Sequence, residues 1–367
     1  MLENSVEKST TDGVTRSSLP AAGIVLDDTF TISAPKDSED SYLSWLTALI
    51  WPLMSILPLL LTAESLPTHY AKLFPSEWYR YDPNVDERPK PLGLTLGILT
   101  VALGHLFLIP IFYAYREGYL SGKKTGFTLK ENLKIEPKSI QKSGARFYNF
   151  YEGLVEHLSQ PEGFVLLGIY LTATWMFKLM PLSYYSFDGN IQWVYVFACL
   201  VIQDGLQFVM HLLEHSVSKA FYNMSHKPHH KFHNPRLFDA FNGSVADTVL
   251  MILLPLYATA NVMRYCNVWT YMAFGTMYAN WLVLIHSEYV FPWDCMFRKL
   301  GLGTPGDHHV HHKVFKYNYG HTFMWFDWIC GTYRSPAEYA PKIFNHGTWT
   351  YLSITNPCYF FILAIIH

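Results

Sequence analysis

Residues 192–215 read QWVYVFACLVIQDGLQFVMHLLEH, an apolar run of membrane length that ends in two histidines. The apolar part, residues 192–212, has about the 20 residues that a helix needs to cross the hydrocarbon core of a bilayer. His211 and His215 are four positions apart, so a helix would place both imidazoles on one face. This stretch predicts a membrane helix that carries a pair of metal-ligand side chains at its end.

The composition of the whole chain also favours a membrane protein. Of 367 residues, 50% are hydrophobic and 15% are charged, whereas soluble domains carry about 25% charged residues. The formal net charge of −2 lacks the basic excess typical of nucleic-acid-binding proteins. The five cysteines form no CxxC pair, which disfavours a disulfide framework or a cysteine-based zinc site.

Three further apolar runs have membrane length, namely residues 43–63, 92–115 and 164–182. The apolar stretch 249–286 is too short for two full crossings with a generous loop, so it predicts two short tilted helices or a re-entrant hairpin. The expected fold is an all-α integral membrane protein with about four transmembrane helices plus a short apolar hairpin. A cytosolic helical cap is expected to hold the histidine-rich di-metal site.

Composition divides the chain into four segments. Residues 1–42 are rich in Ser, Thr and acidic residues, as in a solvated, disordered tail. Residues 43–160 would hold the first two transmembrane helices and a basic connection, 161–335 the clustered histidines, and 336–367 a C-terminal segment.

The distribution of basic residues predicts the orientation in the membrane. The segment 116–146 holds eight Lys or Arg, and the segment 218–236 is also basic. Basic loops remain on the cytosolic side of membrane proteins. We therefore expect both segments, the histidine motifs and the N-terminus in the cytosol.

Twelve of the 17 histidines lie between positions 211 and 321, and nine of them follow a pattern. The spacing HxxHH occurs at 226–230 and again at 308–312, and in a helix these positions share a face. Pro228 would lie in the first turn of such a helix. The expected ligands are His211, His215, His226, His229, His230, His286, His308, His311 and His312. Nine imidazoles are too many for one tetrahedral zinc and favour two metals, whose identity the residues leave open.

Asp204 lies seven residues before His211 on the same helix face. A carboxylate inside an apolar helix is costly and is usually functional. We expect Asp204 to orient a ligating imidazole, and the alternative is a packing hydrogen bond to Gln203 or Gln207. His309 is the most plausible additional ligand.

The order of these motifs resembles the fatty acid hydroxylase and sterol desaturase superfamily. The stretch HHVHHKVFKYNYG, residues 308–320, is similar to sterol C5-desaturases and, slightly less, to C4-methylsterol oxidases. The stretch HSEYVFPWD, residues 286–294, looks more like C4-methylsterol oxidases and sphingoid-base hydroxylases. The resemblance covers about residues 160–335. Leu212 and Ser244-Val245 stand where many members have Arg and His-Pro, so the motifs do not identify one sterol position.

The resemblance implies two iron ions that activate O2 to remove hydrogen from an unactivated C–H bond. Such chemistry belongs to the metal, while the protein holds and shields it. Asn318, between two tyrosines, is expected to reach a metal-bound water. The chain has no haem, flavin, nicotinamide or iron–sulfur motif. The resemblance therefore implies that electrons come from NAD(P)H through an external donor such as cytochrome b5 and its reductase.

The expected function is a sterol C5-type desaturase or a sterol C4-methyl oxidase of the endoplasmic reticulum membrane. The first alternative is a fatty-acyl or sphingoid-base hydroxylase of the same superfamily. A second alternative, from a different class, is a membrane metal transporter, although transporters place ionisable ligands near the membrane midplane. In each of the oxidase readings the substrate is a lipid, and nucleic acid is not a partner.

Overall fold

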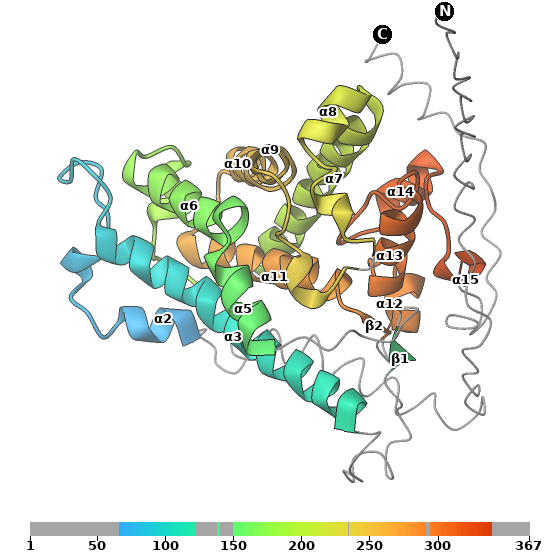
Figure 1. Cartoon of the computed structure of the whole chain (residues 1–367). Coiled ribbons are helices and arrows are strands. Elements are labelled where there is room, and N and C mark those ends of the chain that lie inside the picture. The colour runs from blue at the N-terminus through green and yellow to red at the C-terminus, as the bar shows by residue number, and fades with distance from the viewer. Residues whose placement is uncertain (1–65, 122–137, 140–149, 234, 291–293, 340–367) are drawn as a thin grey trace, which may run out of the picture. The chain divides into compact units, whose positions relative to one another are not determined.

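The computed structural model describes residues 66–121, 138–139, 150–233, 235–290 and 294–339. The predicted N-terminal tail, the first predicted apolar run at 43–63 and most of the C-terminal segment lie outside the described residues. The described part is mostly helical (Figure 1). Its one sheet pairs the two-residue strands β1 (Lys138–Ser139) and β2 (Tyr289–Val290) in antiparallel register.

The helical elements follow one another along the chain with short connections. The longer helices are α3 (Pro91–Ser121), α5 (Phe150–Ser159), α6 (Leu166–Met176), α7 (Trp193–Ser216), α10 (Leu254–Val262), α11 (Val268–Ile285) and α13 (Pro305–Val314). The shorter helices are α2 (Leu66–Ala71), α8 (Lys219–Met224), α9 (Val245–Asp247), α12 (Asp294–Lys299), α14 (Trp325–Cys330) and α15 (Pro336–Tyr339). Single turns of 3-10 or π type are η1 (Ser76–Trp78), η2 (Pro161–Val165), η3 (Leu182–Tyr185), η4 (His229–Lys231), η5 (Leu237–Asp239) and η6 (Thr248–Leu253).

Two helices in the described ranges are long and apolar enough to cross a membrane, judged by length and composition. They are Trp193–Ser216, which confirms the helix expected at 192–212, and Val245–Val262. The second starts earlier than the expected hairpin arm because the Ser244 hydroxyl accepts a hydrogen bond from the Asp247 amide and caps the helix start. The first arm of the expected short hairpin runs without a break through α9, η6 and α10, and the second arm is α11. Each arm is therefore a helix of 18 residues.

The helix expected at 164–182 is shorter than its apolar composition suggested. It starts with a π-type turn in which Gly163 leaves helical geometry, at φ −107° and ψ −105°. The regular part, α6, has 11 residues and so spans only about 16 Å. The run of apolar residues continues to 182, but the helix ends at Met176, because Lys178 takes a left-handed conformation at φ 55°.

The core is organised around α11, which contacts α3, α7, α13 and η5 (Figure 1). Most of its side chains are buried. Helices α3 and α11 approach closely at Gly104 of α3, where an added Cβ would lie 2.1 Å from the Thr276 methyl group. Beside it, His105 Nδ1 lies 2.9 Å from the Asn280 carboxamide oxygen. The α3–α11 contact therefore requires a glycine at position 104.

Gly104→Val is expected to destabilise the fold because the new side chain would force α3 away from α11. Overpacking of this kind costs about 1–3 kcal/mol. Gly168→Val is the matched control, since α6 offers open space around Gly168. The check is the thermal unfolding midpoint of both variants in the same detergent. Equal midpoints would contradict the close packing.

Candidate metal centre

Four separate elements bring nine histidines together. His211 and His215 lie in the last turns of α7, and His308, His311 and His312 lie on α13. His226 follows α8 in a turn, and His229 and His230 form the single 3-10 turn η4. His286 ends α11. The HxxHH spacing at 308–312 is helical as predicted, but 226–230 is not an α-helix, and Pro228 precedes the short turn rather than starting a longer one.

The nine histidines divide into two groups, each of which can hold one metal ion. The five-histidine group consists of His211, His215, His226, His230 and His311. The four-histidine group consists of His229, His286, His308 and His312. Within each group the ligand nitrogens all lie within 4.8 Å of one another. Eight of these residues are buried, and His215 is partly exposed.

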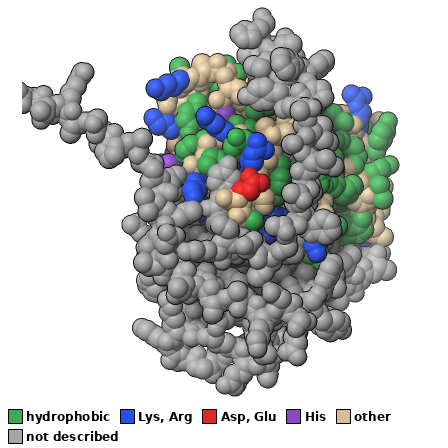
Figure 2. All heavy atoms as spheres, turned by 90° about the vertical axis from the view of Figure 1, so that its right-hand side faces the viewer, with side chains coloured by type: hydrophobic (Ala, Val, Ile, Leu, Met, Phe, Trp, Pro, Cys, Tyr) green, Lys and Arg blue, Asp and Glu red, His purple; other side chains and the backbone are tan. Residues whose placement is uncertain are grey.

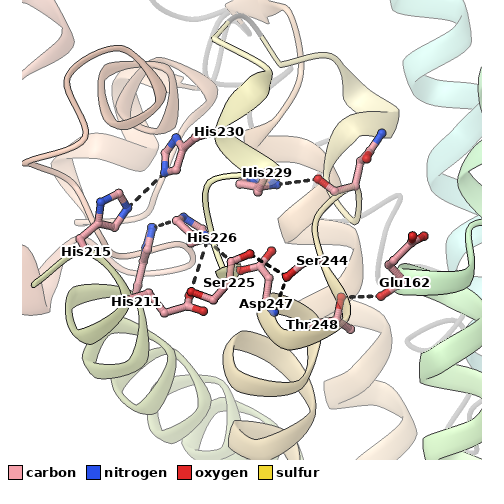
Figure 3. A network of polar contacts seen from close by, with 12 residues as sticks. Glu162, His211, His215, Ser225, His226, His229, His230, Ser244, Asp247 and Thr248 are labelled. Atoms are coloured by element: carbon pink, nitrogen blue, oxygen red, sulfur yellow. Dashed lines mark hydrogen bonds and ion pairs between the residues drawn. The ribbon is translucent and has the colours of Figure 1, made fainter. Parts of the chain in front are cut away.

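The nitrogens that converge are the Nε2 atoms. In the five-histidine group the Nε2 atoms of His211 and His226 are 2.9 Å apart, and those of His215 and His230 are 3.1 Å apart (Figure 3). His311 Nε2 also lies 3.1 Å from His230 Nε2. In the four-histidine group, His286 Nε2 lies 3.3 Å from His229 Nε2 and 3.0 Å from His308 Nε2. His312 and His308 are also 3.0 Å apart at Nε2.

These separations match the edges of a metal coordination shell. A metal-to-imidazole bond of about 2.0–2.1 Å gives neighbouring nitrogens about 2.9 Å apart at a right angle and about 3.4 Å apart in a tetrahedron. All six Nε2 separations lie between 2.9 and 3.3 Å. Imidazole nitrogens are good ligands for iron, zinc, copper and nickel. The donor set therefore fits two nitrogen-ligated metal ions.

Five of the nine imidazoles have a hydrogen-bond partner at the opposite ring nitrogen, Nδ1. The Nδ1 atoms of His211 and His311 each donate to a backbone carbonyl at 2.7 Å, those of Tyr319 and Tyr317. His286 Nδ1 donates to the carbonyl of Leu282 at 2.6 Å. A proton fixed on Nδ1 leaves the Nε2 lone pair free for a metal. These bonds therefore select the ligand atom as well as the ring orientation.

Burial keeps these imidazoles neutral. Removal from water, reinforced by the neighbouring histidines, holds the pKa of His308, His311 and His312 well below the usual value. The neutral form is the one that binds metal. Because they are already neutral, these three imidazoles need not lose a proton to bind a metal at neutral pH.

A pair of acidic residues behind His226 was not predicted from the sequence. His226 Nδ1 lies 2.7 Å from Asp247 Oδ1 and 3.6 Å from Glu214 Oε2 (Figure 3). All three residues are buried. Glu214 lies inside the HxxxH motif, which was the available signal for it. Asp247 is 21 residues from His226 and has no spacing that would have marked it.

The two non-histidine site residues, Asp204 and Asn318, form hydrogen bonds with the backbone. Asp204 contacts no imidazole among the described residues, because its carboxylate accepts the backbone N–H groups of residues 321–323 at 2.6–3.2 Å. Gln203 and Gln207, the alternative partners, pair instead with Thr259 and Tyr278. The Asn318 amide donates to the carbonyls of Asp307 and Arg334 and accepts the Arg334 amide. These bonds orient the Asn318 side chain toward the backbone of Asp307 and Arg334, and its contact with a metal-bound water stays a prediction.

Two further histidines lie close to the centre but outside both groups. His309, expected as an additional ligand, bonds through Nδ1 to the Pro305 carbonyl at 2.8 Å. Burial lowers its pKa to about 4. His321 lies with its ring 5.0 Å from that of His211 and 5.3 Å from that of His308, one member of each group.

Comparisons with known proteins agree with this site. A family model described as fatty acid hydroxylase matches residues 196–332, the part that carries all nine histidines. An alternative squalene epoxidase of Phaeodactylum tricornutum is 60% identical over 305 residues, which cover 83% of this chain and 84% of that protein.

Other relatives are less similar. A Delta(7)-sterol-C5(6)-desaturase of Nicotiana tabacum is 27% identical and matches 40% of this chain and 51% of its own. Methylsterol monooxygenase 1 of Rattus norvegicus is 30% identical, and the match covers 44% of this chain and 56% of that protein. No solved structure matches the chain.

Proposed function

Because the chain belongs to the fatty acid hydroxylase and sterol desaturase superfamily of oxidoreductases, we propose that it is an O2-dependent squalene epoxidase with a histidine-ligated di-iron centre. The observation that carries the proposal is the 60% identity to an alternative squalene epoxidase along 84% of that protein. The desaturases and methylsterol monooxygenases match only 32–56% of their own length at 24–30% identity.

This proposal departs from the expected C5-desaturation or C4-oxidation of a sterol. The motifs that suggested those reactions, at 286–294 and 308–320, contain four of the nine metal-group histidines, namely His286, His308, His311 and His312. The motifs therefore indicate the type of metal centre and do not identify the substrate. Similarity outside these motifs is the better guide to substrate, and it favours squalene.

Epoxidation adds one oxygen atom of O2 across a carbon–carbon double bond. The other oxygen atom leaves as water, with two electrons from a donor and two protons. Two bound iron ions would supply the activation of O2. The protein would hold them through the Nε2 atoms of the two groups, fix five of the nine rings by their Nδ1 bonds, and exclude water by burial. The four-histidine group supplies fewer ligands than its neighbour and would leave more coordination positions open.

We further propose the membrane arrangement expected from the sequence. Residues 161–335 would form the catalytic domain, with about four transmembrane helices in the whole chain and the histidine groups facing the cytosol from the endoplasmic reticulum membrane. Two candidate spans support this placement. Squalene is a hydrocarbon dissolved in the membrane, so a centre at the ends of apolar helices would meet it there.

An external electron donor would dock beside the histidines, and cytochrome b5 with its reductase fits this role. The segment 218–236 has four basic and no acidic residues, and Lys219, Lys227 and Lys231 are exposed. On α13 and α14 the acidic residues Asp307 and Asp327 are buried, while Lys316 between them is exposed. The coloured atoms of the face in Figure 2 show more Lys and Arg than acidic side chains. Such a surface favours an acidic partner.

Lys219→Glu combined with Lys231→Glu is expected to raise the KM for reduced cytochrome b5 about tenfold at low salt, with little change in kcat. The effect should shrink at high salt, because screening weakens surface charge interactions. Lys178→Glu, on the connection after α6, is the control. A salt-independent loss of kcat would argue against docking at this surface.

The proposed function is tested by expressing the chain in eukaryotic cells whose own squalene epoxidase has been deleted. We expect growth without added sterol and a fall in accumulated squalene. Unchanged squalene would contradict the proposal. Accompanying changes in C5–C6 unsaturation or in 4-methylsterols would instead favour a sterol oxidase, and altered ceramides a sphingoid-base hydroxylase. Labile zinc with no lipid change would favour a metal transporter.

A further inference from the structure

The segment 317–323, between α13 and α14, holds two metal-group histidines through its backbone. The carbonyls of Tyr317 and Tyr319 accept the Nδ1 protons of His311 and His211, both at 2.7 Å. Both histidines belong to the five-histidine group. We call residues 317–323 the positioning loop. The Nδ1 protons of two of the five ligands in this group are thus fixed by one short stretch of chain.

Two buried carboxylates accept five consecutive backbone N–H groups of the positioning loop. Asp327 accepts those of Tyr319 at 2.9 Å and Gly320 at 2.7 Å. Asp204, on α7, accepts those of residues 321, 322 and 323 at 3.2, 2.6 and 3.1 Å. Both carboxylates are fully shielded from solvent. A buried carboxylate is stable only when donors satisfy it, and here the loop amides are those donors.

The rest of the loop has little freedom. Asn318 takes a left-handed conformation at φ 56°, and its side chain bonds the backbone of Asp307 and Arg334. A Cβ on Gly320 would lie 2.4 Å from the Phe323 carbonyl oxygen and 2.8 Å from the Asp327 carboxylate. These contacts restrict the conformation of the loop, whose carbonyls at Tyr317 and Tyr319 point at the imidazoles.

We propose that Asp204 and Asp327 are positioning residues for the five-histidine group. They act through the loop, because neither carboxylate has a hydrogen bond to an imidazole in the described part of the chain. Ionised oxygens accept several amide protons at once and form stronger bonds than neutral ones. An amide side chain would instead present N–H groups to some of these donors, and the loop would lose its shape.

The effect should be selective for one metal. In the four-histidine group, His286 Nδ1 donates to Leu282 and His229 Nδ1 to the Asn242 carbonyl, both outside the loop. The ring of His321 beside His308 is the one ring contact recorded between the loop and that group. Disturbing the loop should therefore weaken the binding of the ion in the five-histidine group and leave the binding of the other ion unchanged.

This inference rests on the proposed di-metal centre, and metal content separates the two. Wild-type protein, loaded with iron and dialysed against a weak chelator, should retain two ions per chain. Asp327→Asn should retain about one, because the ion of the five-histidine group binds about 10–100-fold more weakly. A cobalt titration followed by absorbance should show two phases in wild type, with one of them shifted in the variant.

Further variants guard against a general loss of folding. Thr332→Val removes the hydroxyl that donates to Asp327 at 2.6 Å and should give a smaller shift of the same phase. Tyr278→Phe removes a buried hydrogen bond to Gln207 of α7 and should keep both ions. If Asp327→Asn weakens the binding of both ions equally, or of neither, the inference is overturned. Fewer than two ions in wild type would instead contradict the proposed di-metal centre.

Discussion

His311→Ala is expected to abolish squalene oxidation while leaving membrane insertion unchanged. His311 is fully buried and its Nε2 lies 3.1 Å from His230 Nε2, so alanine removes one of the five imidazole ligands of its group. We expect the rate to fall at least about 1,000-fold, which corresponds to about 4 kcal/mol of transition-state stabilisation. His229→Ala should have the same effect through the four-histidine group. Product formation by purified protein with an electron donor is the measurement.

His309→Ala is the matched control, since His309 lies on the same helix and is also buried but bonds Pro305 instead of joining either group. Its activity should remain within about tenfold of wild type. Full activity of either His311→Ala or His229→Ala would refute the assignment of these residues as ligands.

Complete removal of metal is expected to lower the thermal unfolding midpoint by roughly 10 °C. A ligand that binds only the folded state at 1,000 times its Kd contributes about 4 kcal/mol. Each kcal/mol shifts the midpoint of a domain of about 150–250 residues, the size of the segment 161–335, by about 2–4 °C. The apoprotein would also bring Nε2 lone pairs to about 3 Å from one another without a cation. Unfolding is measured before and after chelation, with metal content checked in both samples.

The doubly substituted His229→Ala, His311→Ala protein should respond less to the chelator, because each group has already lost a ligand. A metal-free wild-type protein that unfolds at the same temperature as the loaded protein would contradict the view that the histidines form two metal sites.

The sequence was a good guide wherever the signal was local. The spacing of His308, His311 and His312 predicts a shared helix face, and α13 supplies it, starting at Thr304, whose side chain pairs with the Asp307 amide. Residues 226–230 have the same HxxHH spacing, but the backbone there forms a turn after α8 instead of an α-helix. Those histidines are brought together by tertiary contacts rather than by helical periodicity.

Long-range hydrogen bonding could not be predicted in the same way. Asp204 was correctly singled out as a buried carboxylate, but its partners are backbone amides more than 110 residues away. Asn318 is a polar residue next to the histidine motif, but its side chain forms hydrogen bonds with the backbone of Asp307 and Arg334. Helix lengths were misjudged for a related reason, because Gly163 and Lys178 limit α6 through backbone geometry that apolar composition does not report.

The central claim is tested most directly by supplying the purified, iron-loaded protein with squalene, a reduced electron donor and 18O2. The account predicts a squalene epoxide that contains one 18O atom, formed only when O2 and donor are both present and lost in His311→Ala. Recovery of unmodified squalene alongside oxidation of a sterol or a sphingoid base by the same preparation would contradict it.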